Sequence, residues 1–447
     1  MKLSAPVSKL ACSLSWLSAL IIVLVPFHAF LTVWLASAVG HYTLLRLWKE
    51  FLLVPIVLGA LYILLVDKPL RRKFLSLKLV WLIAAYILVL VICAAVGLAK
   101  HWVDTKAMWY GLLVDLRYLV FFLAVLVLTA RCSFLQRHWL KLLLGPAILV
   151  AAFAILQYLV LPYDFLKHFG YGPATILPYE TINHNINHIR VASTTRGANP
   201  LGAYLVVPVC ALAVLLIKEK RRWLDKVIIG AGLLLALIFS FSRSAWIGAA
   251  LGVLAVGWLA IKSPKLKRAA WWALGGVAVV AIIVAVALRN NHTFQDVFLH
   301  TDSASTIAQS SNEGHAAAFK AAAKDIAHQP LGGGVGSAGP QSVYNNHLAR
   351  IAENYYLQIG QEAGIIGMVL FIAIIIYVGY LLYGQRTNPL ALALLASLVG
   401  LSLVNFLSHA WEDDTLAYVW WGLSGIALSP VILKARNKNG QARLKKT

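Results

Sequence analysis

The chain has 447 residues, of which 60% are hydrophobic and 13% are charged, and its mean hydropathy is +0.77. Soluble domains are roughly 45–50% apolar and 25% charged, so this composition excludes a soluble globular protein and predicts an integral membrane protein. A net charge of +22 suggests nucleic-acid binding in a soluble chain, but the placement of the cations along this chain has another explanation.

The chain contains about twelve apolar segments that approach the length of about 20 residues needed to span a bilayer core. We therefore predict an all-α, polytopic membrane protein with a single transmembrane domain over residues 1–447. The predicted helices lie near residues 10–35, 49–66, 79–99, 110–130, 140–160, 199–217, 226–241, 244–261, 269–288, 355–383, 389–407 and 415–433.

Lys and Arg are distributed unevenly over the loops that join these helices. If the N-terminus is inside, the cytoplasmic loops and ends carry 26 of the 39 cations and the other side carries 12, with Arg117 inside a helix. The positive-inside rule then places both termini in the cytoplasm. The basic stretches KEKRRWLDK and KARNKNGQARLKKT are predicted topology anchors, and nucleic acid is not an expected partner.

Two predicted external loops are long enough to be more than connectors. They cover residues 161–198 and residues 289–354, and the second lies between the ninth and tenth helices. The second loop contains GHAAAFKAAAKDIAHQ, which is rich in good helix formers, followed by LGGGVGSAG. We predict a helix at the membrane surface and then a flexible turn.

The sequence gives no sign of a metal or of a disulfide framework. Four cysteines lie in or beside predicted helices, without the spacing of metal ligands and outside the external loops: Cys12, Cys93, Cys132 and Cys210. His184 and His188 in HNINH are four residues apart, but a zinc site needs a helix to bring them together and at least one further ligand. We predict neither a disulfide framework nor a metal or other cofactor.

Ionisable residues gather at the external ends of the predicted helices, where burial is expensive and residues of this kind mark functional sites. They are Asp115, Arg117, Arg190, Arg196, Arg243 and Glu353. Arginine forks bind phosphate oxygens at two points, so the arginines together predict a site for a diphosphate carried on a lipid. The alternative is that each arginine reaches separately to lipid headgroups.

Four stretches in chain order resemble a known family: RVASTTRGANPLGAYL, FSRSAWIGA, HQPLGGGVGSAG and ENYYLQIGQEAGIIG. Together they are similar to the successive signatures of the O-antigen ligase and polymerase superfamily. The resemblance covers roughly residues 180–383. It implies a GT-C-like fold and an inverting, metal-independent glycosyltransferase at the outer face of the cytoplasmic membrane, with an undecaprenyl-diphosphate-linked glycan as donor.

The resemblance also implies roles for individual arginines. Arg190 or Arg196 is similar to the arginine before the family's Asn-Pro signature, and Arg243 is similar to the arginine of its Ser-Arg turn. These residues are therefore expected to bind the diphosphate, with Arg117 as a further cation. Preorganised cations stabilise the charge on a departing diphosphate without a metal.

Two positions depart from the family's pattern. Many relatives begin the last motif with His-Asn, where this chain has Glu353 and Asn354, and many have arginine at the start of the loop helix, where this chain has His315. A partly desolvated glutamate can accept a proton from a hydroxyl, so we predict Glu353 as the general base. Asn354 is expected to orient Glu353 or the acceptor sugar, and His315 to donate to phosphate. Glu353 is alternatively a carboxylate that stabilises a helix N-terminus, and His315 a residue of a surface helix.

A second acidic group, WEDD at residues 411–414, lies on the predicted external side. We expect a solvated loop that offsets nearby arginines, with the binding of a cation or of the acceptor as the alternative. Tyr355 and Tyr356 follow the predicted base closely and are candidate platforms for a sugar ring.

The sequence thus predicts a membrane glycosyltransferase that moves a lipid-linked glycan to a hydroxyl of a glycan, lipid or protein acceptor on the external face. A polymerase that adds repeat units to a lipid-linked chain shares these motifs and is an alternative, as is a protein O-oligosaccharyltransferase. A transporter of lipid-linked glycans is a further alternative. Charged or broken helices near the bilayer midplane and an inverted repeat favour a transporter, whereas here the polar residues gather at one face and no repeat is detected.

Overall fold

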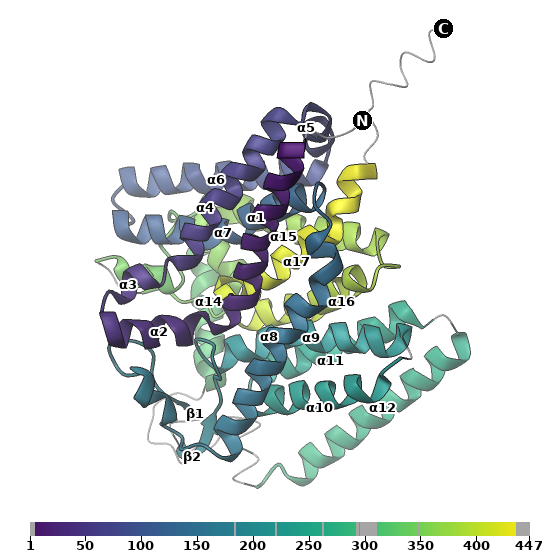
Figure 1. Ribbon diagram of the computed structural model, residues 1–447. Helices are drawn as coiled ribbons and strands as arrows, with labels where there is room; N and C mark the ends of the chain where they lie inside the picture. The colour runs from purple at the N-terminus through teal and green to yellow at the C-terminus, as the bar shows by residue number, and fades with distance from the viewer. Residues whose placement is uncertain are drawn as a thin grey trace.

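The computed structural model describes residues 5–182, 185–219, 221–261, 263–291, 295, 311–346 and 349–434, and helices dominate this part of the chain (Figure 1). The α-helices are α1 (Ala5–Leu24), α2 (His28–Val39), α3 (Tyr42–Leu45), α4 (Trp48–Val66), α5 (Lys68–Leu75), α6 (Lys78–Ala99), α7 (Thr105–Thr129), α8 (Phe134–Leu159), α9 (Ala198–Lys218), α10 (Trp223–Phe239), α11 (Arg243–Ala260), α12 (Pro264–Ala287), α14 (Ser311–His328), α15 (Tyr355–Gly384), α16 (Pro389–Leu407) and α17 (Asp414–Lys434). Shorter elements are the 3-10 helices η1 (Val25–Phe27), η2 (Phe165–Phe169), η4 (Pro340–Tyr344) and η5 (Ala410–Glu412) and the strands β1 (Glu180–Ile182) and β2 (Asn185–Arg190).

Ten helical segments of the described residues are long and apolar enough to cross a membrane, and each coincides with a predicted helix. The helices α10 and α12 occupy the other two predicted positions but are not among these ten. Long apolar helices form here because a chain in lipid must satisfy every backbone polar group internally, which a helix does within one segment. The prediction of an all-α polytopic membrane protein is confirmed.

The first apolar segment is broken, whereas the sequence predicted one helix near residues 10–35. The helix α1 ends at Leu24, Pro26 lies in η1, and α2 turns sharply away from α1 (Figure 1). Proline has no backbone N–H and its ring clashes with the preceding turn, which explains a break at this position. The helix α2 therefore runs across one end of the bundle.

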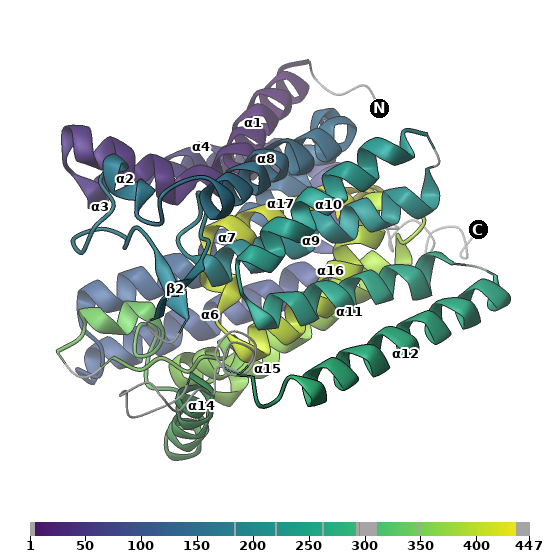
Figure 2. The same ribbon diagram turned by 90° about the horizontal axis from the view of Figure 1, so that it is seen from below.

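The other end of the bundle holds the start of α1 and the end of α17. The Lys73 ammonium of α5 donates to the Leu433 carbonyl at 2.5 Å. The Arg131 guanidinium, just after α7, lies 2.6 Å from the Asp67 carboxylate, just before α5. The helices α2 and α14 and the β1–β2 hairpin lie at the opposite end (Figures 1 and 2), which we call the site end.

A disulfide joins Cys12 of α1 to Cys132, which follows α7. The two Cα atoms are 5.3 Å apart, and the residues are separated by 120 positions in the sequence. The expectation of no disulfide is therefore wrong for this pair. Only the packing of α1 against α7 and α8 brings the two cysteines together.

The glycine-rich segment after α14 is buried, although the sequence predicted a flexible turn. The Gly333 N–H donates to the Gln361 carbonyl at 2.7 Å, beside a break in α15 where Gly364 has a φ of 68°. A Cβ atom on Gly332 would lie 2.5 Å from the Glu362 carbonyl oxygen. The segment thus satisfies a backbone group that the break in α15 leaves without its helical partner, and only a residue without a side chain fits this close approach.

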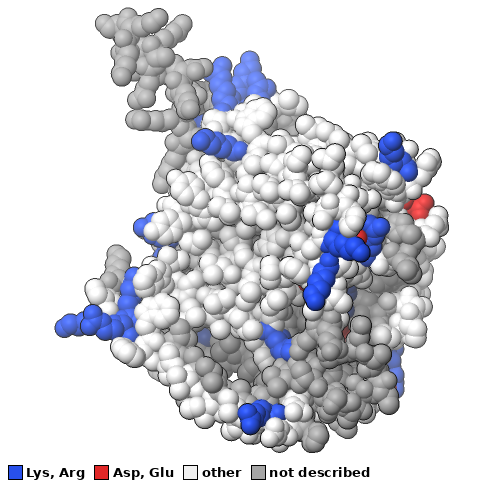
Figure 3. Space-filling view, turned by 180° about the vertical axis from the view of Figure 1, so that it is seen from behind, with Lys and Arg blue, Asp and Glu red and all other residues white. Residues whose placement is uncertain are grey.

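The outer surface of the helices is suited to lipid. On the face in Figure 3, scattered Lys and Arg side chains interrupt a mostly uncharged surface. Large apolar side chains are exposed along many helices, among them Trp81 and Leu88 of α6 and Ile376 of α15. Exposed apolar surface of this extent is rare in soluble monomers, and it matches helices that face a bilayer.

Candidate functional site

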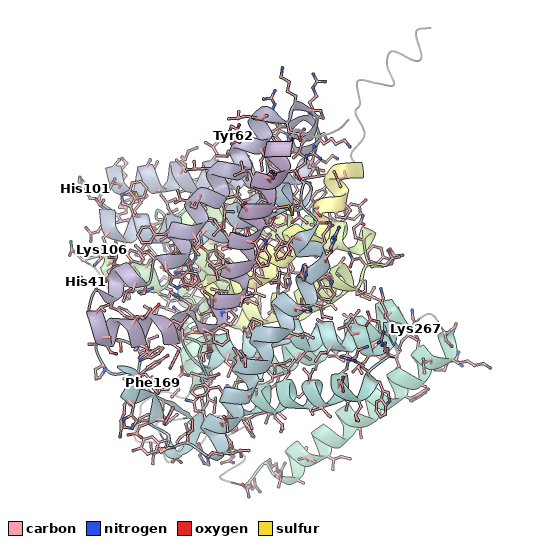
Figure 4. The ribbon with its side chains drawn as sticks, viewed as in Figure 1. His41, Tyr62, His101, Lys106, Phe169 and Lys267 are labelled. Atoms are coloured by element: carbon pink, nitrogen blue, oxygen red, sulfur yellow. A yellow bond between two sulfur atoms is a disulfide. The ribbon has the colours of Figure 1, made fainter. Side chains whose placement is uncertain are left out.

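A cavity of 430 Å³ lies at the site end, among α2, α4, α7, η4 and the segment from η5 into α17. Its lining includes cations, carboxylates and tyrosines. Lys106, labelled in Figure 4, marks this side of the molecule, and its ammonium lies 4.2 Å from the centre of the Tyr344 ring on the cavity wall.

Arg117 forms part of this lining and is held by groups from three other segments. Its guanidinium lies 2.5 Å from the Asp414 carboxylate and 3.5 Å from that of Glu50, and it donates to the Glu412 carbonyl at 2.8 Å. The Lys49 ammonium lies 3.4 Å from the other oxygen of Asp414. Buried ions are stable only when partners replace their hydration, so this network accounts for a buried arginine in α7.

Arg196, immediately before α9, is the more open cation of the cavity. Its side chain is 45% exposed, and its guanidinium lies 3.8 Å from the Asp413 carboxylate, which is 6% exposed. Burial raises the pKa of Asp413, and the positive charge of Arg196 opposes that rise. Arg196 therefore presents its charge to solvent at the cavity edge, whereas Arg117 does not.

Glu412 contributes a carboxylate in which one oxygen accepts a hydrogen bond and the other does not. The Gln358 amide donates to its Oε1 at 2.8 Å, while its buried Oε2 has no hydrogen-bond partner among the described residues. Burial raises the pKa of Glu412 to about 7, although the Gln358 hydrogen bond and the charge of Arg196 oppose that rise. This side chain can accept or release a proton near neutral pH.

Arg190 and Arg243 lie together in a second place, beside the hairpin. Arg190 ends β2, donates to the Asn199 side-chain oxygen at 2.6 Å and lies 3.7 Å from the Glu180 carboxylate of β1. It also donates to the Ser240 carbonyl at 3.3 Å, in the turn that leads to Arg243. Arg243 is half-buried at the first position of α11 and lies within electrostatic range of Arg190. Burial lowers the pKa of Arg190, and the Glu180 charge opposes this.

Glu353 lies in a third place, where α14 approaches the start of α15. The His315 Nδ1 atom lies 3.5 Å from the Glu353 Oε2 atom, and both side chains are partly exposed. Glu353 has a φ of 52°, a left-handed conformation that is uncommon for a residue with a side chain. Such strain concentrates at functional sites.

Asn354 uses its side chain to cap α15. Its Oδ1 accepts from the Leu357 N–H at 3.0 Å, and its Nδ2 donates to the Phe406 carbonyl at 2.9 Å. The capping role that the sequence left open for Glu353 thus belongs to Asn354.

His409 connects the Glu353 pair to Arg196. Burial, together with the charges of Arg196 and His315, lowers the pKa of His409 to about 4. The imidazole is therefore neutral at physiological pH, and its buried Nδ1 has no hydrogen-bond partner among the described residues. His409 thus lies within electrostatic range of both Arg196 and His315, and His315 contacts Glu353.

Two sequence-based expectations fail at this site. The WEDD segment is not a solvated loop, because Glu412 and Asp413 are each 5% exposed, although it does offset Arg117 and Arg196. Tyr355 is fully buried, with its hydroxyl 3.0 Å from that of Tyr118, so it presents no platform to a sugar. The tyrosines that line the cavity are others, Tyr42, Tyr110 and Tyr344.

Among the described residues, no group of three or more His, Cys, Asp or Glu side chains has the arrangement of a metal site. His184, one of the pair considered for zinc, lies outside the described residues.

Residues 228–372 match the family model described as O-antigen ligase. Over this part of the chain the sequence is similar to the O-antigen ligase family. The match supports a member of the O-antigen ligase and polymerase superfamily, in agreement with the motif resemblance. A search among curated proteins returned no match.

The matched region contains part of the site and lacks the rest. Arg243, His315, Glu353 and Asn354 lie within residues 228–372. Arg190 and Arg196 precede the matched region, and the Arg117 network is built from the N-terminal helices and α17. The fold therefore brings residues from outside the matched region, such as Arg190, against residues within it, such as Ser240.

Sequence analysis missed several residues of this site. They are His28, Arg46, Lys49, Glu50 and His409. His28 lies at the break in the first apolar segment, and the other three of the first four lie around the start of α4, where the sequence showed only an ordinary membrane boundary. The charged pair Lys49–Glu50 at the predicted start of a helix was the sequence feature that could have indicated these residues.

Proposed function

We propose that this chain is a membrane glycosyltransferase that moves a glycan from an undecaprenyl-diphosphate donor to an acceptor hydroxyl. The match to the O-antigen ligase family supports the general reaction class. If both termini lie in the cytoplasm, as the positive-inside rule predicts, the site end faces the outside of the cytoplasmic membrane. Lipid-linked donor then reaches the site from the outer leaflet.

The observation that carries this proposal is that Arg243 lies within electrostatic range of Arg190. The two guanidinium groups come from β2 and α11, and the Ser240 carbonyl helps to hold Arg190 beside the turn that begins α11. Like charges held close together are stabilised by a shared anion, and arginine forks match phosphate oxygens. In this proposal the pair binds the diphosphate, Arg196 and His315 assist it, and Arg117 supports the cavity.

Glu353 is the proposed general base. It takes the proton of the acceptor hydroxyl while the hydroxyl oxygen attacks the anomeric carbon and the bond to the diphosphate breaks. The departing diphosphate carries the negative charge, which the arginines stabilise without a metal. A single displacement of this kind inverts the anomeric centre.

The decisive experiment is glycan transfer by purified protein in nanodiscs, with an undecaprenyl-diphosphate oligosaccharide as donor and EDTA present. We expect Arg243→Ala and Glu353→Gln to lose transfer while remaining folded. Arg221→Ala is the matched control, because Arg221 is an exposed arginine in the α9–α10 connection at the other end of the bundle. Wild-type transfer by Arg243→Ala would remove the diphosphate role, and full transfer by Glu353→Gln would remove the base.

Ligase and polymerase differ in the acceptor, so the product separates them. Loss of long chains in cells without the gene indicates a polymerase, while long chains retained on the lipid carrier indicate a ligase. Glycoprotein staining tests transfer to protein. Movement of donor across the bilayer without transfer would favour the transporter.

A further inference from the structure

The 430 Å³ cavity at the site end shares only Arg196 and the supporting Arg117 with the proposed diphosphate site. Arg190, Arg243 and Glu353 are absent from its lining. Its volume falls within the range of small-molecule pockets, about 300–1,000 Å³. A pocket of this size beside a candidate transferase site needs an occupant of its own.

Cationic and acidic residues line the cavity in equal number. Four cations line it: Arg46, Lys49, Arg117 and Arg196. Four carboxylates also line it, those of Glu50 and of residues 412–414. Arg117, Lys49 and Arg196 each lie within 4 Å of at least one of these carboxylates. A diphosphate would bring negative charge to a surface already neutralised, so the cavity suits a ligand without net charge.

The cavity offers the contacts that a hydroxyl-rich ligand uses. The rings of Tyr110 and Tyr344 pack with centroids 4.9 Å apart on one wall. Aromatic walls with a few fixed polar groups are typical of specific small-molecule sites, and ring faces pack against the C–H faces of sugars. Hydroxyl groups both donate and accept, so they can pair with carboxylates and cations alike.

Glu412 brings to the lining a buried oxygen that has no hydrogen-bond partner among the described residues. The Glu412 Oε2 atom is buried without a hydrogen bond among the described residues, on a side chain that is 5% exposed and lines the cavity. An unpaired buried oxygen costs about 1–3 kcal/mol, and a ligand hydroxyl that donates to it removes that cost. Glu412 thus brings an unpaired acceptor to the wall of a cavity that is large enough for a ligand.

We propose that the cavity binds a neutral, hydroxyl-rich glycan, with Glu412 accepting from a hydroxyl and the Tyr110–Tyr344 wall packing against a sugar ring. The site itself stands on the cavity's own chemistry, and only its link to transfer rests on the proposed function. The glycan can belong to the acceptor or to the saccharide part of the donor, since both share this chemistry.

Binding is measured by saturation-transfer NMR on the full chain in nanodiscs, with maltotriose, cellotriose and chitotriose as probes. We expect saturation transfer to at least one probe, a dissociation constant weakened about tenfold in Tyr344→Ala, and recovery in Tyr344→Phe. Inorganic pyrophosphate should not displace the probe. Tyr110→Ala, from the same wall, serves if Tyr344→Ala does not fold, and Arg221→Ala is the control.

The absence of binding by all three probes would overturn the proposal, as would equal binding by wild type and both tyrosine variants or displacement by pyrophosphate. The assay needs no catalysis, so its outcome is independent of whether the chain transfers glycans. If transfer is observed, Tyr344→Ala distinguishes the two sources. A raised KM for the acceptor alone assigns the cavity to the acceptor, and a raised KM for the donor alone assigns it to the donor saccharide.

Discussion

Arg117 and Asp414 form a 2.5 Å ion pair that joins α7 to α17 at the cavity. Asp414 also accepts Lys49, so one carboxylate holds two cations from two helices. These side chains are at most 15% exposed, and such pairs fix the relative position of helices because neither partner can be left alone. The shape of the cavity therefore depends on charges that make no contact with the proposed diphosphate site.

Replacing Asp414 with Asn should destabilise the protein strongly. The change removes the negative charge that Arg117 and Lys49 share. Loss of one partner of a buried ion pair typically lowers the free energy of unfolding by about 3–5 kcal/mol. The measurement is the free energy of unfolding in detergent. Asp225→Asn is the control, because Asp225 is exposed and lies at the other end of the bundle; an equal loss in both variants would show that the buried network is unimportant.

Glu412→Gln should change how stability depends on pH. The pKa of Glu412 is raised to about 7 in the fold, from an ordinary value of 4.5, so the folded state holds a proton that the unfolded state releases. Wild-type stability is therefore greatest below about pH 4.5 in this respect and falls until about pH 7. The variant lacks this fall, so its stability relative to wild type should improve by on the order of 3 kcal/mol between pH 4 and pH 8.

Unfolding at the two pH values measures this difference. Glu219→Gln is the control because Glu219 is exposed on the other end of the bundle. A constant gap between wild type and Glu412→Gln would show that folding does not raise the pKa of Glu412.

Glu353→Gly should be more stable than wild type. Glu353 has a φ of 52°, where a residue with a side chain costs about 1–2 kcal/mol and glycine does not. The greater chain entropy of glycine offsets about 0.5–1 kcal/mol of this, so a gain of roughly 0.5–1 kcal/mol remains. Thermal unfolding tests it beside Glu353→Ala, which keeps the strain and should not gain. If Glu353→Gly is no more stable than Glu353→Ala, the left-handed backbone at this position carries no strain.

Gly332→Ala should disrupt the packing of the glycine-rich segment against α15 and so lower the stability of the protein. The new Cβ atom would lie 2.5 Å from the Glu362 carbonyl oxygen, at a φ of 92°. We expect a loss of about 3 kcal/mol or more, from overpacking and left-handed strain together. Gly232→Ala in α10 is the matched control, because no atom lies within 4 Å of the position of its Cβ. Equal thermal stability of the two variants would contradict the tight packing of this segment.

The sequence predicted structure correctly where a single local property, such as the hydropathy of a segment, specifies it. A run such as KLVWLIAAYILVLVICAAVGLA in α6 can only be a spanning helix, because apolar length and internal hydrogen bonding suffice to specify it. Pro26 also causes the break between α1 and α2 by a local effect, but the apolar run continues through it, so hydropathy predicted one helix. Helix positions therefore followed from the sequence, while the bend that places α2 over the site end did not.

The sequence by itself determined the membrane class, the positions of the helices and the motifs that resemble the O-antigen ligase family, because hydropathy and local residue order carry that information. Only the tertiary structure decided that Arg190 joins Arg243, that Arg117 belongs to a buried network and that WEDD is enclosed. These relationships join residues as far apart as Glu50 and Asp414. A charge's partner depends on which helices pack together, and hydropathy, which specifies where helices lie along the chain, does not specify which of them become neighbours.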